Sequence, residues 1–348
     1  MRLQANKNRY QSDYSNDIEA ALSARLVGQS AAIDAIVPVL QMYQAGLCPE
    51  GRPIGVFMLL GPTGTGKTRT VEALAEVLHG TSKKMLKVDC GEFQMEHEVA
   101  KLIGAPPGYM GHRETQPMLN QQKLNSITSE MCDISLVVFD EIEKAAPSLT
   151  RILLGVLDKA SLRLGDNNTV NFERTMIFLT SNLGARTMQK ELKPDFGFEQ
   201  FVPKDQAGTP EKLQRIGMSE VRRKFSPEFV NRIDYVITYR PLSSESLSLI
   251  LDQQLEALQV HINRRLGVNS FLLEVPSKTR RMLLKLGTSE EYGARELKRT
   301  IQRNLIQPLA MVVSSGAIEP GSRVIADIND ARTKLIIRVQ DAAFDPAA

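Results

Sequence analysis

The residues best suited to chemistry lie in the octapeptide GPTGTGKT at residues 61–68. Its spacing, GxxxxGK[ST], is typical of a phosphate-binding loop, in which consecutive backbone N–H groups face phosphate oxygens and glycine lets the backbone approach closely. Lys67 is then predicted to reach the β- and γ-phosphates of a nucleoside triphosphate, and Thr68 to bind Mg²⁺. The predicted loop consists of Gly61, Pro62, Thr63, Gly64, Thr65, Gly66, Lys67 and Thr68.

Two adjacent carboxylates are the second candidate. The apolar run at residues 135–139 ends in Asp140 and Glu141. Such a pair is common where a strand meets a turn. In a sequence that also has a phosphate loop about 70 residues earlier, however, the pair indicates a site for nucleotide hydrolysis. Asp140 is predicted to complete the Mg²⁺ shell, and Glu141 to polarise the attacking water as a general base.

The elements around these residues predict how they are positioned. Short apolar runs alternate with helical or loop sequence, a pattern typical of a mostly parallel sheet covered on both faces. We therefore predict a doubly wound α/β domain, with a long surface loop at residues 185–214. A helix preceding the phosphate loop is expected to have Ser30 as its N-cap, and Pro38 is expected to kink this helix or remove one of its hydrogen bonds. The predicted strands are residues 56–60, 85–90, 134–140 and 175–181.

The pattern changes after Pro241, where helical periodicity is interrupted by strand-like runs at residues 271–275 and 334–339. This indicates a smaller α+β domain, helical with short strands. We predict a polar, disordered segment at 1–17, a large domain at 18–240, a small domain at 241–340 and a tail at 341–348.

Composition narrows the classes of protein. The chain has 348 residues, 42% of them apolar, which is ample for two domains with apolar cores. Its formal charge of only +3 gives little reason to expect nucleic acid or an anionic membrane as partner. Its three cysteines have no CxxC spacing and its four histidines no HxxxH pattern, which argues against a metal cluster. No apolar run of about 18 residues occurs. We expect a cytoplasmic protein without a membrane anchor.

Seven segments, taken together, resemble the C-terminal AAA+ ATPase module of the Clp/heat-shock-100 unfoldases and disaggregases. They occur in that family's order and spacing between about residues 26 and 325. The resemblance implies a ring of six subunits, and it implies ATP and Mg²⁺ as the ligands. The segments are LVGQSAAIDAI, RPIGVFMLLGPTGTGKT, LIGAPPGYMGH, LVVFDEIEKA, TMIFLTSNLGA, FSPEFVNRID and EYGARELKRTIQRNLIQPLA.

The resemblance also implies roles for further residues. Asn182 matches the sensor-1 position, where an amide orients the lytic water. Arg232 matches the arginine finger, which reaches a nucleotide held by the adjacent subunit, and Arg295 matches sensor 2 on the small domain. Val27 and Gly28 resemble the segment that packs beside adenine.

Two loops are implied to meet other polypeptides. Tyr109 and Met110 match the pore loop that grips an extended client, and Gly108 and Gly111 favour a mobile tip with a sequence-tolerant apolar contact. The tripeptide Phe196-Gly197-Phe198 lies where protease-coupled relatives dock a peptidase ring. Three residues are little evidence, and an ordinary Gly-containing surface loop is the favoured explanation of this tripeptide.

Some positions depart from the family's pattern. The segment after Gly111 lacks the usual glycine pair, and Ser161 stands where the family tends to have an arginine. The family's N-terminal substrate domain and first ATPase module are not found in this sequence, so an adaptor for the client is one expectation.

The sequence therefore predicts an ATPase that threads polypeptide through the pore of a homohexameric ring, as an unfoldase or disaggregase-like chaperone. Two alternatives remain open at this point. One is an assembly or activation ATPase dedicated to a single partner protein, and the other is a nucleic-acid-handling AAA+ motor, which the weak net charge and the aromatic loop disfavour.

Overall fold

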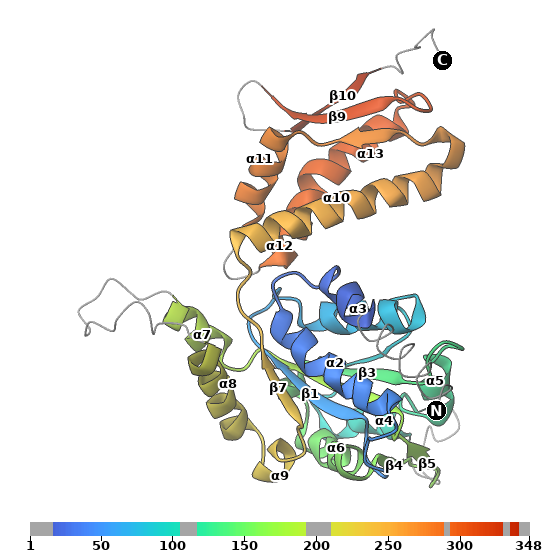
Figure 1. The fold of residues 1–348 in the computed structure, drawn as a ribbon, viewed down its shortest axis with the longest axis vertical. Helices are drawn as coiled ribbons and strands as arrows, with labels where there is room; N and C mark the ends of the chain where they lie inside the picture. The colour runs from blue at the N-terminus through green and yellow to red at the C-terminus, as the bar shows by residue number, and fades with distance from the viewer. Residues whose placement is uncertain (1–16, 105–116, 193–209, 289–292, 330–334, 341–348) are drawn as a thin grey trace, which may run out of the picture. The chain divides into compact units, whose positions relative to one another are not determined.

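A computed structural model describes residues 17–104, 117–192, 210–288, 293–329 and 335–340. These residues form two compact units, whose boundary in the sequence falls between Arg240 and Pro241. Each unit has its own sheet and its own apolar core (Figure 1). The phosphate loop and both candidate carboxylates belong to the sequence before this boundary.

The large unit is built on a five-stranded sheet in the order β2-β3-β6-β1-β7. Every pairing in it is parallel, so the carboxyl ends of the strands meet along one edge. The three central strands are buried at every residue except Asp140 and are mostly apolar, as expected of a sheet covered on both faces. The strands are β1 (Gly55–Leu60), β2 (Leu86–Asp89), β3 (Ser135–Asp140), β6 (Thr175–Ser181) and β7 (Tyr235–Thr238).

Helices cover both faces of this sheet. Side chains alternate along β1, so that Phe57 and Leu59 join one core and Val56, Met58 and Leu60 the other. The first core includes apolar residues of α2 (Ser30–Gln44) and α3 (Lys67–His79). The second includes residues of α6 (Pro147–Lys159), α8 (Pro210–Lys224) and α9 (Pro227–Val230). Helices on two faces of a parallel sheet confirm the predicted doubly wound α/β class (Figure 1).

Shorter elements complete the large unit. Residues 17–23 are also helical. The short helices are η1 (Cys90–Glu92), η2 (Glu96–Val99), α4 (Ala100–Ile103), α5 (Gln121–Ser126), η3 (Ile142–Lys144) and α7 (Ala185–Leu192), and β4 (Ser161–Arg163) pairs with β5 (Thr169–Asn171) in a hairpin.

The small unit is α+β, as predicted. Its helices pack on a three-stranded sheet of order β10-β9-β8, in which β8 and β9 are parallel and β9 and β10 antiparallel. The helices are α10 (Ser244–Leu266), η4 (Gly267–Asn269), α11 (Ser277–Gly287), α12 (Ala294–Ile301), η5 (Gln302–Ile306) and α13 (Gln307–Ser314); the strands are β8 (Leu272–Glu274), β9 (Arg323–Ile328) and β10 (Leu335–Gln340). Across the described residues of both units, no helix is long and apolar enough to cross a bilayer.

Several local predictions were wrong. Residues 185–214 are not one loop, because they include α7 and the start of α8, which bury Met188 and Leu213. Gln29, not Ser30, is the N-cap of α2, and its side chain makes no capping bond. Pro38 lies inside this helix, as predicted, and the helix ends at Gln44. Strands β4, β5, β7 and β9 were not predicted, since runs of three to six residues give too little periodicity to recognise.

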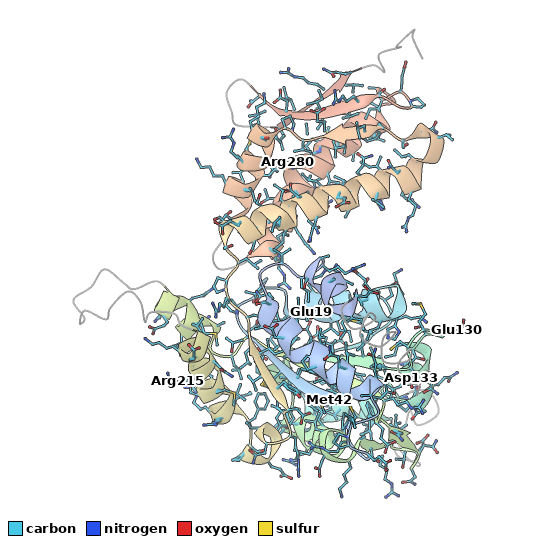
Figure 2. All side chains as sticks on the ribbon, viewed as in Figure 1. Glu19, Met42, Glu130, Asp133, Arg215 and Arg280 are labelled. Carbon is cyan, nitrogen blue, oxygen red and sulfur yellow. The ribbon has the colours of Figure 1, made fainter. Side chains whose placement is uncertain are left out.

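Replacing Phe178 by alanine should destabilise the large unit strongly. Phe178 is completely buried in β6, and its ring stacks on Phe57 with centroids 5.0 Å apart. We expect the free energy of unfolding to fall by about 3–5 kcal/mol, the usual cost of removing a buried phenyl ring. Urea titration followed by circular dichroism measures it. The control is Met42→Ala, because Met42 is 42% exposed on α2 (labelled in Figure 2); an equal loss in both variants would contradict the prediction.

Candidate nucleotide site

The phosphate loop leaves the carboxyl end of β1 and enters α3 through backbone conformations that require glycine. Gly61 has φ +145°, and a Cβ added there would lie 2.6 Å from the carbonyl oxygen of Tyr239. Gly66 is the left-handed N-cap of α3, with φ 104°. The first turn of a helix of 13 residues therefore begins directly after the glycines, where its N–H groups and dipole favour an anion.

Lys67, the first residue of α3, has a buried ammonium group. It donates hydrogen bonds to the carbonyl oxygens of Gly61 at 2.6 Å and Pro62 at 2.9 Å. A third bond of 2.9 Å reaches Oδ1 of Asn182, directly after β6. Only 8% of Lys67 is exposed, so these acceptors compensate for burying its charge. Groups at the ends of the neighbouring strands β1 and β6 thus bond the same ammonium group of Lys67.

Asp140 ends β3 next to β6. It accepts a hydrogen bond from the Thr180 hydroxyl and forms a 2.6 Å ion pair with Lys87 of β2. Burial alone raises the pKa of the Asp140 carboxyl, but the hydrogen bonds from Lys87 and Thr180 outweigh it and hold the pKa below its ordinary value. The carboxylate is therefore ionised at neutral pH and at moderately acidic pH, as a cation-binding group must be.

Glu141 occupies a strained backbone conformation. Its φ of 55° and ψ of 49° are left-handed, which is uncommon for a residue with a side chain. Its N–H donates to the Thr180 hydroxyl at 3.0 Å, so the same hydroxyl contacts both candidate carboxylate residues. The neighbouring strand therefore holds the turn in which Glu141 leaves β3.

The Glu141 carboxylate is bonded at both oxygens. Oε1 accepts from the Asn182 amide at 3.2 Å, and Oε2 forms a 2.5 Å ion pair with Lys144. The hydrogen bond and the charge of Glu141 raise the pKa of the Lys144 ammonium. Because Asn182 also accepts from Lys67, its amide links the phosphate-loop lysine to the candidate base.

Asn182 is itself held by a residue that the sequence analysis missed. Its backbone N–H donates to Oε1 of Glu143 at 3.0 Å. Lys87, Lys144 and Thr180 were missed too. Thr180 had a usable signal, since it stands two residues before Asn182 at the end of a buried strand, and Lys144 follows Glu141 at i+3.

The residues fit a nucleotide with its Mg²⁺ ion. The loop has glycine where a Cβ would strike Tyr239, and a helix begins directly after it. Asp140 is an ionised carboxylate, and the Thr68 hydroxyl lies in the first turn of α3. Carboxylate and hydroxyl oxygens are the donors that Mg²⁺ prefers.

The predicted adenine-flanking residues Val27 and Gly28 lie just before Gln29, the N-cap of α2. Gly28 has φ 75°, a left-handed turn that leads into the helix. The next residue, Gln29, is 7% exposed, and its side-chain amide donates to the carbonyl oxygen of Arg240 at 3.1 Å. The turn is therefore bonded to the last residue of the large unit.

Arg232 lies away from these groups. It precedes β7, which runs parallel to β1, so it stands at the amino edge of the sheet while Lys67 follows the carboxyl edge. Its guanidinium forms a 2.8 Å ion pair with Asp158 at the end of α6, and 34% of the side chain is exposed. The structure thus does not bring Arg232 and Lys67 of one chain together.

Arg295 is exposed on α12 of the small unit. The predicted pore residues Tyr109 and Met110 lie outside the described residues, as does the tripeptide Phe196-Gly197-Phe198.

Comparison with known proteins identifies the family. Residues 52–236, more than half of the chain, match the AAA domain (Cdc48 subfamily). The chain belongs to the AAA ATPase family. Residues 242–326 match the C-terminal, D2-small domain, of ClpB protein, which confirms the resemblance to the Clp/heat-shock-100 group.

Relatives of this AAA chain align with nearly all of it. ClpB of Vibrio cholerae serotype O1, a chaperone protein, is 36% identical over 313 residues, covering 90% of this chain and 34% of that protein. ClpC of Staphylococcus epidermidis, an ATP-dependent Clp protease ATP-binding subunit, is 35% identical over 320 residues, covering 92% and 37%. The chain thus spans about a third of the length of these relatives.

A solved structure has the same fold. The closed-state cryo-EM reconstruction of Hsp104 with ATPγS and FITC casein superposes with a TM-score of 0.76 at 26% identity. The match covers 95% of this AAA chain and 52% of the Hsp104 chain.

Thr180→Val should slow ATP turnover by this AAA chain. Valine keeps the shape of the side chain but removes the hydroxyl that bonds Asp140 and Glu141. Hydrogen bonds to charged groups contribute about 1.5–3 kcal/mol, so we expect kcat to fall about tenfold or more. Phosphate release at saturating ATP measures kcat. Thr175→Val, at the opposite end of β6, is the matched control; equal rates in the two variants would refute the role of Thr180.

Proposed function

We propose that the chain is an ATP-hydrolysing subunit of a ring-shaped, hexameric protein remodeller that unfolds polypeptide clients. The observation that carries the hydrolytic part is the amide of Asn182, which is bonded at once to Lys67 and Glu141. One amide that bonds both the phosphate-binding lysine and the candidate base suits a site that hydrolyses its nucleotide. A site that only binds the nucleotide needs no such link. The family match supports the same reaction.

Each residue has a role in this proposal. The loop from Gly61 to Thr68 binds the phosphates, with Lys67 contacting the β- and γ-phosphates. Glu141 accepts the proton of the attacking water, and Asn182 orients that water. Asp140 and Thr68 would hold Mg²⁺, which when bound would neutralise charge developing on the phosphates.

The ring is proposed because Arg232 of one chain is placed far from the phosphate loop of the same chain. Arg232 stands at the edge of the sheet opposite to the phosphate loop, so it is suited to reach the nucleotide of an adjacent copy. Its ion pair with Asp158 holds the guanidinium at that edge, and about a third of the side chain is exposed. Arg295 is proposed to contact the γ-phosphate from the small unit, and Val27 and Gly28 the adenine.

The client is proposed to be unfolded polypeptide. The Hsp104 reconstruction was obtained with casein, and the ClpB relatives are named chaperones. Tyr109 and Met110 would grip the client in the pore. An adaptor that delivers clients, a peptidase that docks on Phe196-Gly197-Phe198, and a cytoplasmic location are further parts of this proposal.

Glu141→Gln should bind ATP but turn it over far more slowly. Glutamine keeps the hydrogen bond from Asn182 but cannot accept the proton, and a general base contributes about 10²–10⁴-fold. Titration with a fluorescent ATP analogue measures binding, and phosphate release measures kcat. Turnover at the wild-type rate would exclude Glu141 as the base.

The same assay tests the client. Wild-type ATPase activity should increase with unfolded casein and not with single-stranded DNA. Stimulation by DNA alone, lost at high salt, would point to a nucleic-acid motor. No stimulation by either would favour an ATPase dedicated to one partner protein.

Arg232→Ala should abolish hydrolysis by a uniform ring yet allow complementation. An arginine supplied from a neighbouring chain contributes about 10³–10⁵-fold. Lys67→Ala subunits cannot bind phosphate but retain Arg232, so mixing the two inactive variants should restore some activity. Phosphate release across mixing ratios measures it. No activity at any ratio would contradict a finger that acts between subunits.

A further inference from the structure

Tyr239 is completely buried beneath the phosphate loop, although the loop is far from it in sequence. It follows β7 directly and is only 1% exposed. Its hydroxyl lies 2.7 Å from Oγ1 of Thr70 in the first turns of α3. No motif in the sequence pointed to this tyrosine, and none of the roles proposed above uses it.

The direction of this hydrogen bond follows from a count of hydrogens. The Thr70 hydroxyl donates its single hydrogen to the carbonyl oxygen of Gly66 at 3.1 Å. It must therefore accept the hydrogen of Tyr239. Burial raises the pKa of the Tyr239 phenol, so the donor hydrogen is retained at physiological pH. A relay of two hydroxyls thus runs from Tyr239 through Thr70 to Gly66, the last glycine of the loop.

The backbone of Tyr239 holds the other end of the loop. Its N–H donates to the carbonyl oxygen of Leu60 at 2.7 Å. Its own carbonyl oxygen is the atom that a Cβ on Gly61 would approach to 2.6 Å. One residue therefore contacts the phosphate loop at Gly61, where the loop begins, and through Thr70 at Gly66, where it ends.

The hydroxyl is not required for packing. Phenylalanine would fill the same space, and Thr70 would remain bonded to Gly66 without it. A buried phenol costs free energy unless it is bonded, so its gain must come from the bond to Thr70. That bond fixes the distance between the end of β7 and the first turns of α3.

We propose that the Tyr239 hydroxyl is a positioning group that sets the affinity of the phosphate loop for the polyphosphate of a nucleotide. The inference rests on the proposed nucleotide binding. The hydroxyl is proposed to affect binding of the phosphates and not of the base, because Gly61 and Gly66, which Tyr239 contacts directly or through Thr70, both lie in the phosphate loop. The affinity for adenosine, which has no phosphate, should therefore not depend on the hydroxyl.

Tyr239→Phe tests the proposal by removing one oxygen atom. We expect the Kd for MgADP, measured by isothermal titration calorimetry, to rise about 2- to 12-fold, the range allowed by an ordinary hydrogen bond. The Kd for adenosine should not change. The matched control is Tyr43→Phe, which removes a hydroxyl bonded to Asp133 at 3.0 Å on the surface (Asp133 is labelled in Figure 2). It should bind MgADP as the wild type does.

A double-mutant cycle with Thr70→Val separates positioning from packing. If the relay acts as a unit, the double variant should bind MgADP no more weakly than the weaker single variant. If the fold-increases in Kd of the two single variants instead multiply in the double variant, the relay is contradicted. A Tyr239→Phe variant with a lower melting temperature but an unchanged Kd would contradict it too. If Tyr239→Phe does not fold, Thr70→Val alone still tests the relay, because it must weaken MgADP and spare adenosine.

The outcome also separates this inference from the proposed function. Failure of the wild-type chain to bind MgADP would remove the proposed function. Normal binding by both the wild type and Tyr239→Phe would overturn only the role of the hydroxyl.

Discussion

The parallel pairing of β1, β6 and β3 is the constraint on which the rest of the site depends. Parallel strands end at one edge, and their register sets Leu60 beside Ser181 and Phe139 beside Leu179. The residues that follow these pairs are the phosphate loop, Asn182 and the two carboxylates. A shift of one residue would turn every side chain of a strand to the opposite face and dismantle both the cores and the site.

Charge is concentrated at this edge and is compensated locally. Lys67 is bonded to carbonyl and amide oxygens, Asp140 to Lys87, and Glu141 to Lys144. Burying an unpaired charge costs far more than burying a paired one, so each of these groups has a partner of complementary character. The strained backbone at Glu141 persists because Thr180 bonds its N–H from the next strand.

The two edges of the sheet have different uses. The carboxyl edge collects the groups that would hold and hydrolyse a nucleotide, whereas Arg232 and Asp158 form their ion pair near the amino edge. A sheet about four to six residues deep separates them, and the intermolecular role that we propose for Arg232 rests on this separation. Tyr239, directly after β7, belongs to the carboxyl edge, where its hydroxyl is bonded to Thr70 of α3.

By itself the sequence determined the fold class, the phosphate loop and the carboxylate pair. These depend on neighbours in the chain: an apolar run, glycines at set spacing, and charged residues directly after a strand. Only the tertiary structure decided the partners Lys87–Asp140, Thr180–Glu141 and Tyr239–Thr70. Such pairs join residues distant in sequence, and strand order and register, which local patterns do not encode, determine which of them meet.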